Sequence, residues 1–225
     1  MPNAIGFDVY GTLVDPLEMN QYLHHFVGDK AEHFAELWRS KQIEYAFRRG
    51  LMNKYETFGV CTKQALLFAM HTLKVDLSAH NQEQLIEDYQ NLQAFPDVLP
   101  GLSALKSQGY TLVAFSNGVE STVRTLLERA GVLTHLDGVV SVDDLKTFKP
   151  DPKVYAYLAR RLNHPMDETW LVSSNSWDVI GAKSAGLKSA WLQRQPDKVF
   201  DPWEISPDLI VPSIEELSTR LERGV

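Results

Sequence analysis

Hydrophobic and polar residues alternate with two different periods along this chain. Between Leu17 and Phe95, apolar residues recur every three to four positions, a spacing typical of amphipathic helices, and almost no strand-like alternation is present. The helix candidates, separated by glycines or by a short polar break, are Leu17–Val27, Lys30–Arg49, Thr62–Leu73 and Asn81–Leu92. Four such helices joined by short loops predict a compact bundle.

Outside this segment, short apolar runs alternate with helical segments. The first run ends at Asp8, and the later strand candidates are Tyr110–Phe115, Gly138–Ser141, Trp170–Ser173, Ser189–Leu192 and Leu209–Val211. The helix candidates are Leu99–Lys106, Val119–Arg129, a helix opened by Pro152, Trp177–Ala185 and Pro212–Leu221. This order predicts an α/β fold with a doubly wound, mostly parallel Rossmann-like sheet. We expect a core domain of residues 1–15 and 96–225, with residues 16–95 inserted as a four-helix-bundle cap domain.

Composition and charge exclude several classes of protein. The 225 residues are 44% hydrophobic and 23% charged, with a net charge of −7 that disfavours a nucleic-acid partner. No apolar run approaches the ~20 residues that cross a bilayer, so we expect no membrane partner. The first strand begins at once and leaves no room for a signal peptide. The single cysteine, Cys61, excludes an internal disulfide. These features predict a soluble, cytoplasmic protein.

Polar residues follow several of the predicted strands where each strand ends. They form four clusters, namely Asp8 with Thr12, Ser116-Asn117-Gly118, Lys149, and Ser173-Ser174-Asn175 with Asp178. Taken singly, each has an ordinary explanation as a turn, a solvated side chain or a helix cap. In a doubly wound sheet, however, the loops that follow the strands share one edge, where such folds place ligands. The clusters are therefore expected to converge on one site.

This order of clusters resembles the four motifs of the haloacid dehalogenase superfamily, in which the first Asp is a nucleophile. Most members are Mg²⁺-dependent phosphatases with a second Asp two positions after the nucleophile and an acidic pair in the fourth motif. This chain has Tyr10 at the first of these places and Asp178 as the single carboxylate at the second. Two carboxylates beside Lys149 supply little charge for a divalent ion, so we expect no metal and no cofactor.

The chain resembles the (S)-2-haloacid dehalogenase branch over nearly its full length. The matching segments are Phe7–Thr12, Trp38–Tyr45, Ser116–Gly118, Phe148–Tyr155 and Ser173–Asp178. The segment around Arg39 is the most specific because it lies in the inserted helices and not in the common core. One departure is Ser40, where a Gln is expected. The resemblance implies hydrolysis of short (S)-2-haloalkanoic acids to (R)-2-hydroxy acids through an aspartyl ester, by an enzyme that is a homodimer.

The resemblance also implies a role for each residue of the site. Asp8 would attack C2 of the substrate, Asp178 would activate the water that hydrolyses the ester, and Lys149 would keep Asp8 ionised. Thr12 would hydrogen-bond Asp8, and the residues expected to orient Lys149 and Asp178 are Tyr155, Ser173, Ser174 and Asn175. The groups expected to hold the substrate carboxylate are the Ser116 hydroxyl and the backbone N–H groups around Val9, Tyr10 and Asn117. Arg39 would bind the halide with Asn117 and Trp177, and Phe58 and Trp177 would line a dry pocket.

Other interpretations of the same residues stay open at this stage. The protein could be a divergent Mg²⁺-dependent phosphatase, or a non-catalytic scaffold that binds a carboxylate. Arg39 could be a solvated or salt-bridged arginine, Tyr155 a packing aromatic, and Trp177 a core residue. Phe34, Trp38 and Phe47 are assigned to packing, and the histidines show no metal-ligand spacing.

Overall fold

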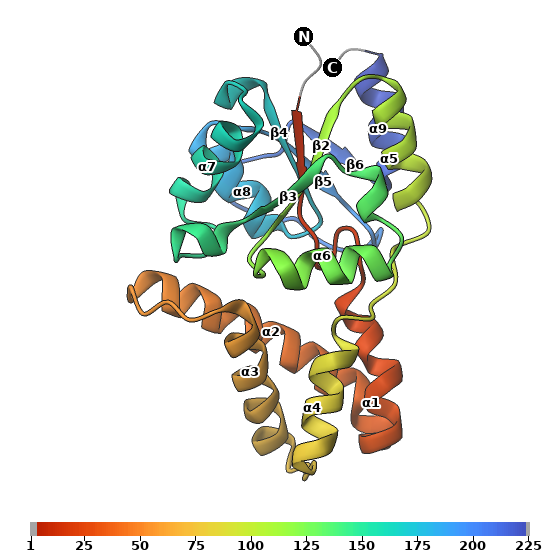
Figure 1. Ribbon diagram of the computed structural model, residues 1–225, viewed down its shortest axis with the longest axis vertical. Helices are drawn as coiled ribbons and strands as arrows, with labels where there is room; N and C mark the ends of the chain where they lie inside the picture. Colours follow the sequence, from red (N-terminus) through yellow and green to blue (C-terminus); the bar gives the residue numbers. More distant parts are fainter. Residues whose placement is uncertain (1–3, 224–225) are drawn as a thin grey trace.

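A parallel β-sheet forms the centre of the upper part of the molecule, and helices cover both of its faces (Figure 1). The computed structural model describes residues 4–223. Residues 1–3 and 224–225 lie outside the described residues, and the expectation that the chain has no signal peptide concerns the first of these segments. The strands are β1 (Ala4–Phe7), β2 (Thr111–Ser116), β3 (Gly138–Ser141), β4 (Thr169–Ser173), β5 (Lys188–Leu192) and β6 (Leu209–Val211). Their spatial order is β3-β2-β1-β4-β5-β6, with every neighbouring pair parallel.

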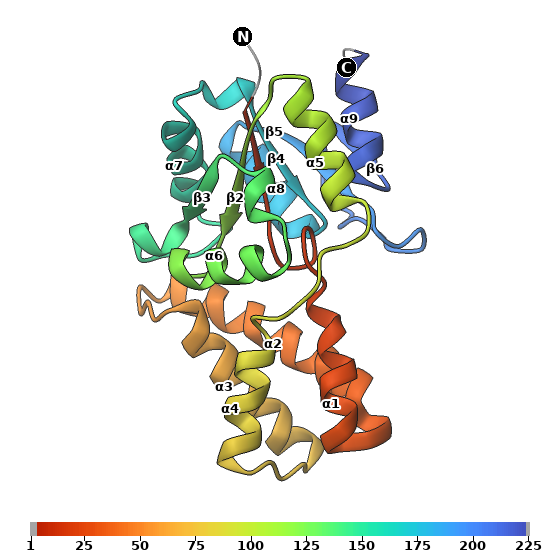
Figure 2. The same cartoon turned by 45° about the vertical axis from the view of Figure 1, so that its right-hand side comes forward.

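The helices fall into two sets. The sheet carries α5 (Val98–Ser107), α6 (Glu120–Arg129), α7 (Pro152–Leu162), α8 (Ser176–Ala185) and α9 (Ile214–Glu222). A separate group below it contains α1 (Met19–Val27), α2 (Ala31–Leu51), α3 (Phe58–Leu73) and α4 (Ala79–Asp88) (Figure 2). Short 3₁₀ helices span Pro16–Glu18, Gly28–Lys30, Leu133–His135, Val142–Leu145 and Met166–Glu168. No helix among the described residues combines the length and apolar composition needed to cross a bilayer.

The sheet separates two hydrophobic layers. On β2, Leu112 and Ala114 belong to the layer that α5, α6 and α9 complete, whereas Val113 and Phe115 belong to the layer that contains α7 residues. A central strand covered on both faces needs apolar side chains on both, which explains the continuous apolar run 112–115 within β2. The arrangement confirms the predicted doubly wound α/β fold with inserted helices.

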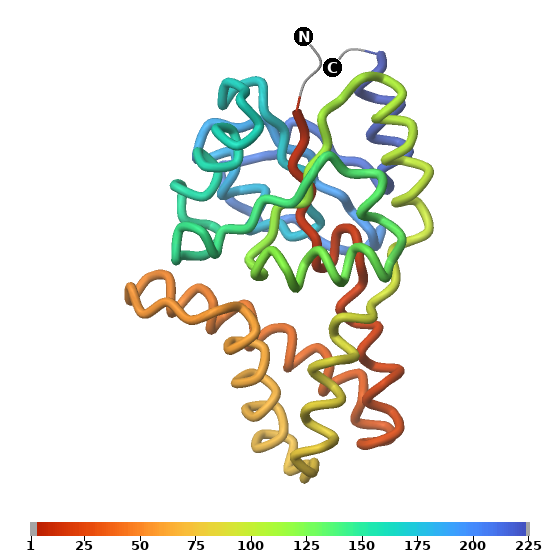
Figure 3. Tube along the Cα trace, in the orientation of Figure 1, coloured from red at the N-terminus to blue at the C-terminus, as the bar shows by residue number. Residues whose placement is uncertain are grey.

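Two chain segments connect the helical group to the sheet, and they run side by side (Figure 3). The backbone N–H of Phe95 donates to the carbonyl of Leu13 at 3.1 Å, and that of Asp15 to the carbonyl of Gln93 at 3.4 Å. Because the outgoing and returning segments bond to each other, the helical group begins and ends at the same point beside the carboxyl end of β1.

Two glycines allow close approach near this end of the sheet. Gly11 has φ +89°, a left-handed conformation that suits glycine, and it turns the chain sharply after β1. Gly181 lies where α8 meets α7, and a Cβ atom there would lie 2.5 Å from the Tyr155 hydroxyl. A side chain at position 181 would therefore push Tyr155 away from α8.

Candidate active site

The four polar clusters meet at the carboxyl edge of the sheet. β1 lies between β2 and β4, so the loops that carry Asp8, Asn117 and Asp178 are neighbours, and the segment after β3 brings Lys149 beside them. All four side chains are buried. The convergence expected from the strand order is thus present in the structure.

The Asp8 carboxylate is held by donors on both oxygens. Its Oδ2 accepts hydrogen bonds from Asn175 Nδ2 at 2.7 Å, from Thr12 Oγ1 at 3.0 Å and from Ser173 Oγ at 3.4 Å. Its Oδ1 accepts one bond, from Lys149 Nζ at 3.1 Å. Since Oδ2 is surrounded by donors, Oδ1 is the oxygen whose lone pairs are more available for reaction.

Lys149 is the central cation of the site and is 1% exposed. Its Nζ donates to Asp8 Oδ1, to Asp178 Oδ2 at 2.8 Å and to the carbonyl of Phe115 at 2.9 Å, which uses all three donors of an ammonium group. Burial alone would lower the pKa of Lys149, but the carboxylates of Asp178 and Asp8 outweigh this effect and raise its pKa. The ammonium is therefore charged at neutral pH.

Asp178 is fully buried between Lys149 and Tyr155. The Tyr155 hydroxyl donates to Asp178 Oδ1 at 2.7 Å. Burial raises the pKa of Asp178 and the charge of Asp8 adds to this, while Lys149 and the Tyr155 hydrogen bond act in the opposite direction. Burial and the carboxylate of Asp178 raise the pKa of Tyr155 well above its ordinary value, so Tyr155 remains a neutral donor. Tyr155 is more than a packing aromatic, because it contacts the second carboxylate directly.

The residues at this edge do not fit a divalent cation. The ammonium of Lys149 bridges the two carboxylates, and each Asp178 oxygen already accepts a hydrogen bond. The side chain of Tyr10 contributes an aromatic ring and not a carboxylate. Within residues 4–223, no group of three or more His, Cys, Asp and Glu side chains is placed to hold a metal ion. We therefore assign the charge balance of the site to Lys149.

Several donors around Asp8 have no partner of their own. The backbone N–H groups of Val9, Tyr10 and Asn117 donate no hydrogen bond within the described chain. Asn117 Oδ1 accepts from the backbone N–H of Lys149 at 2.9 Å, which fixes the amide and leaves its Nδ2 free to donate. Ser116, also buried, ends β2 beside them. Free N–H groups at a loop of this kind form a site for a small anion.

Arg39 reaches this site from α2. Its guanidinium donates to the carbonyl of Tyr10 at 3.1 Å and to Gln42 Oε1 at 2.6 Å, and it lies 5.9 Å from the centre of the Tyr10 ring. Arg39 forms no ion pair with any described carboxylate. The structure thus brings Arg39 to the loop after β1 with its charge uncompensated.

Sequence reasoning missed Gln42, which is fully buried next to Arg39. Its Oε1 accepts from Arg39 and from the Tyr89 hydroxyl at 3.2 Å, and its Nε2 donates to Thr62 Oγ1 at 2.7 Å. Every polar atom of the amide is therefore engaged, and the guanidinium is held in one orientation. The sequence signal was a glutamine three residues after Arg39, on the same face of a helix.

The aromatic residues connect the helical group with the sheet. The Phe58 ring is buried, 5.8 Å from the Tyr10 ring and 6.3 Å from the Phe148 ring. Trp177 is half-buried and meets Phe47 edge-on at 5.1 Å. Phe47, which the sequence assigns to packing, also lines a cavity of about 350 Å³ whose lining includes Lys149.

The partners expected for the loop after β4 are wrong. Ser173 and Asn175 bond to Asp8 and not to Lys149 or Asp178. Ser174 bonds to the carbonyl of Gly11, and its backbone N–H donates to Thr12 Oγ1 at 2.9 Å. The physical reason is that β4 pairs directly with β1, so this loop faces the loop of Asp8. The side chain of Ser40, the one departure from the motif around Arg39, is exposed.

Known proteins share both the sequence and the fold. The sequence model of the family of haloacid dehalogenase-like hydrolases matches residues 2–186. (S)-2-haloacid dehalogenase 1 of Pseudomonas sp. (strain CBS-3) is 39% identical, covering 85% of this chain and 84% of that protein. (S)-2-haloacid dehalogenase 4A of Burkholderia cepacia is 36% identical, covering 99% of this chain and 96% of that protein.

Among solved structures, L-2-haloacid dehalogenase from Xanthobacter autotrophicus with chloropropionic acid covalently bound superposes with a TM-score of 0.91. The two chains are 29% identical and are covered completely. The nucleophile-like Asp8, the buried lysine between two carboxylates and the inserted helices agree with these likenesses. The chain belongs to the family of haloacid dehalogenase-like hydrolases.

Proposed function

We propose that this protein is an (S)-2-haloacid dehalogenase, a hydrolase of carbon–halide bonds that converts short (S)-2-haloalkanoic acids to (R)-2-hydroxy acids. The observation that carries the proposal is the buried Asp8 carboxylate, whose charge is balanced by Lys149 and whose Oδ1 accepts a single hydrogen bond. The full-length similarity to dehalogenases from Burkholderia and Xanthobacter supports it. The substrate is a small molecule, and no cofactor takes part in the scheme.

The first step is displacement at carbon. Asp8 Oδ1 attacks C2 of the substrate from the side opposite the halogen, which forms an ester, inverts C2 and releases the halide with the bonding electron pair. Lys149 faces the nucleophile, with its Nζ 3.1 Å from Asp8 Oδ1, and balances its charge. Halide departure needs no acid, and this agrees with the absence of a carboxyl group at Tyr10, the position where phosphatases of the superfamily carry one.

The substrate and the leaving group each have donors in the site. The substrate carboxylate binds the Ser116 hydroxyl and the unpartnered N–H groups of Val9, Tyr10 and Asn117. The halide faces Arg39, the side-chain amide of Asn117 and the edge of Trp177. Phe58 closes the pocket and excludes water. The less hydrated the carboxylate nucleophile is, the lower its barrier to attack.

The second step is hydrolysis of the ester. Once Oδ1 is bonded to the substrate, Oδ2 becomes the ester carbonyl oxygen, and Asn175, Thr12 and Ser173 already donate to it. These donors stabilise the negative charge that forms on Oδ2 when water attacks. Asp178 accepts one proton of that water. When the tetrahedral intermediate collapses, the bond between the Asp8 carboxyl carbon and the substrate oxygen breaks, and the leaving alkoxide takes up the second proton of the water. This gives the hydroxy acid and restores the Asp8 carboxylate, and Asp178 then loses its proton to solvent. Ser174 positions Thr12 through its backbone N–H.

The proposed reaction also assigns a role to each of two domains. We propose a core domain of residues 1–15 and 96–225 and a cap domain of residues 16–95 that supplies Arg39 and Phe58. The paired connections near Leu13 and Phe95 support these boundaries. A cap joined at one point can close over a substrate without disturbing the sheet.

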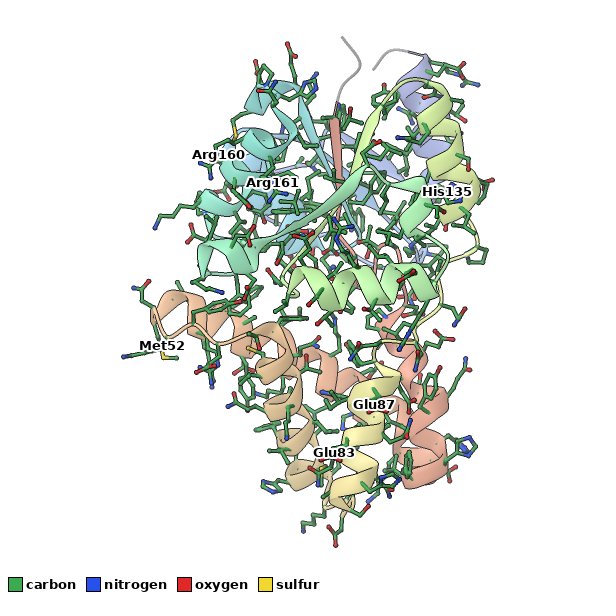
Figure 4. All side chains as sticks on the ribbon, viewed as in Figure 1. Met52, Glu83, Glu87, His135, Arg160 and Arg161 are labelled. Atoms are coloured by element: carbon green, nitrogen blue, oxygen red, sulfur yellow. The ribbon has the colours of Figure 1, made fainter. Side chains whose placement is uncertain are left out.

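We further propose a cytoplasmic homodimer. The free, buried Cys61 agrees with a reducing compartment. Leu51 and Met52 support self-association, because they leave apolar side chains 85% and 59% exposed at the end of α2, where Figure 4 shows Met52 directed outward.

Substrate choice and metal dependence test the function directly. With excess EDTA, we expect halide release from (S)-2-chloropropionate and none from the (R) enantiomer, measured by a chloride electrode with lactate chirality checked by chromatography. The parallel assay is p-nitrophenyl phosphate with Mg²⁺. Phosphate release that stops on chelation, without any halide release, would identify a phosphatase instead. Halide and phosphate assays that are both negative would favour a non-catalytic scaffold.

Gln42 should act through Arg39. A hydrogen bond to a charged group contributes about 1.5–3 kcal/mol, so we expect Gln42→Leu to lower kcat roughly 10- to 100-fold. Gln42→Glu keeps the shape of the side chain but places a carboxylate against Arg39, which compensates the charge of the guanidinium. This variant should therefore lower kcat as well. Because chloride is the poorer leaving group, both variants should lose more activity with 2-chloropropionate than with 2-bromopropionate. Stopped-flow halide assays give both rates.

The matched control for these variants is Gln84→Leu on α4, which should leave the bromide-to-chloride rate ratio unchanged. Circular dichroism checks that each variant is folded. An equal loss of rate with the two substrates would show that Gln42 has no influence on halide departure.

The pH dependence of ester hydrolysis should report Asp178. Asp178 must be ionised to accept a proton and its pKa is raised, so the rate should fall as pH drops through a value above the ordinary aspartate pKa of about 4. On the alkaline side the rate should stay level, because the pKa of Lys149 is also raised. Rapid quench with mass spectrometry of the intact protein measures decay of the ester.

Tyr155→Phe removes a hydrogen bond that lowers the pKa of Asp178, so the acid limb should move to higher pH. Tyr157→Phe, a change on the same helix, is the control and should leave the limb in place. If the acid limb of the pH–rate profile did not move in Tyr155→Phe, Asp178 would be excluded as the group whose titration sets it.

A further inference from the structure

A second cavity lies beside the Asp8 loop, on the side where the cap meets the segment after β5. Its volume is about 400 Å³, and its lining includes Arg39 from the cap, Ser174 and Asn175 from the loop after β4, and Lys198 and Arg194 from the segment after β5. Arg39 and Asn175 both bond to the carbonyl of Tyr10 and so border the catalytic site as well. The cavity therefore adjoins the place where the halide would leave.

The cations of this cavity are unequally compensated. Arg194 forms an ion pair with Asp97 and also bonds to the carbonyl of Thr12. Lys198 is different, since its Nζ donates only to the carbonyl of Ser174, at 3.0 Å, and it forms no ion pair within residues 4–223.

Arg39 also lacks an ion pair, as described above. The carboxylate that lines the same cavity is Asp15, and its Oδ1 already accepts a hydrogen bond from the backbone N–H of Leu17 at 2.9 Å. The cavity thus carries an excess of positive charge in a chain whose net charge is −7.

We propose that Lys198 and Arg39 together hold the halide ion in this cavity after it leaves the substrate carbon and before it reaches solvent. The assignment rests on the dehalogenase function proposed above. A monovalent anion fits because each cation already has a neutral oxygen partner and neither has a carboxylate. Two uncompensated cations that face one cavity repel each other, and an anion between them removes that repulsion.

The ionisation of Lys198 agrees with this arrangement. Desolvation and the nearby charge of Arg39 lower its pKa, whereas Asp8 and Asp201 act in the opposite direction. A carboxylate paired directly with Lys198 would have raised its pKa. Lys198 is also exposed, so an anion from solvent can reach its ammonium directly.

Chloride binding to the resting, full-length enzyme tests the proposal without turnover. The probe is sodium chloride at constant ionic strength, followed by line broadening of ³⁵Cl⁻ in NMR spectra of the wild type, Lys198→Gln, Lys198→Arg and the control Lys153→Gln. Lys153 is exposed, as Lys198 is, but it does not line the cavity. Glutamine can still donate to the Ser174 carbonyl, so Lys198→Gln removes the charge while keeping that contact. We expect roughly fivefold weaker chloride affinity in Lys198→Gln, the effect of one solvent-screened charge pair. Lys198→Arg and Lys153→Gln should remain within twofold of the wild type.

Chloride affinity that is unchanged in Lys198→Gln, or lowered equally in Lys153→Gln, would overturn the proposal. The same variants are also titrated with propionate, which carries a carboxylate but no halogen. If Lys198→Gln weakened the binding of propionate and not that of chloride, the halide assignment would likewise be overturned. The result is separable from the proposed function, because chloride binding is measured without substrate. Loss of chloride affinity in an enzyme that releases no halide from haloacids would keep the anion site and reject the dehalogenase.

Discussion

The ammonium of Lys149, buried between Asp8 and Asp178, is the interaction on which the rest of the site depends. Two carboxylates this close in a buried place would repel each other, and one of them would take up a proton. Lys149 donates to both and balances their charge. In the proposed scheme this leaves Asp8 to attack and Asp178, whose pKa burial raises, to act as the base. Removing one partner of such a buried group leaves an uncompensated charge, so the three residues form one unit.

The fold explains how this unit is held. The central strand β1 pairs with β4. Thr12 from the loop after β1, and Ser173 and Asn175 after β4, donate to Asp8, while Lys149 reaches it from the segment after β3. Three of these donors bond to Oδ2. In the proposed scheme this leaves Oδ1 to react and prepares Oδ2 for the charge of the second step. The helices between residues 16 and 95 bring the Arg39 guanidinium to this loop, where the proposed scheme gives it the leaving halide, and Gln42 fixes its direction.

Much of this organisation could be predicted from the sequence. The alternation of apolar runs and helical segments located the strands, and because parallel strands end at one edge, Asp8, Ser116, Lys149 and Asp178 could be expected to meet. Side-chain partners could not be predicted in the same way. Asn175 bonds to Asp8 across 167 positions, a choice that depends on which strand pairs with β1 and on side-chain rotamers. Lys198 lies in a segment without periodicity, so nothing in the sequence placed it beside Arg39.

The central claim is that Asp8 attacks carbon and carries the substrate as an ester. A single turnover of (S)-2-chloropropionate by excess enzyme in H₂¹⁸O tests it most directly, with mass spectrometry of both the lactate and the peptide that contains Asp8. Because water attacks the carboxyl carbon of Asp8, the account predicts ¹⁸O in Asp8 and unlabelled (R)-lactate. Label in the lactate hydroxyl with an unlabelled Asp8 would contradict it, since water would then have attacked C2 itself.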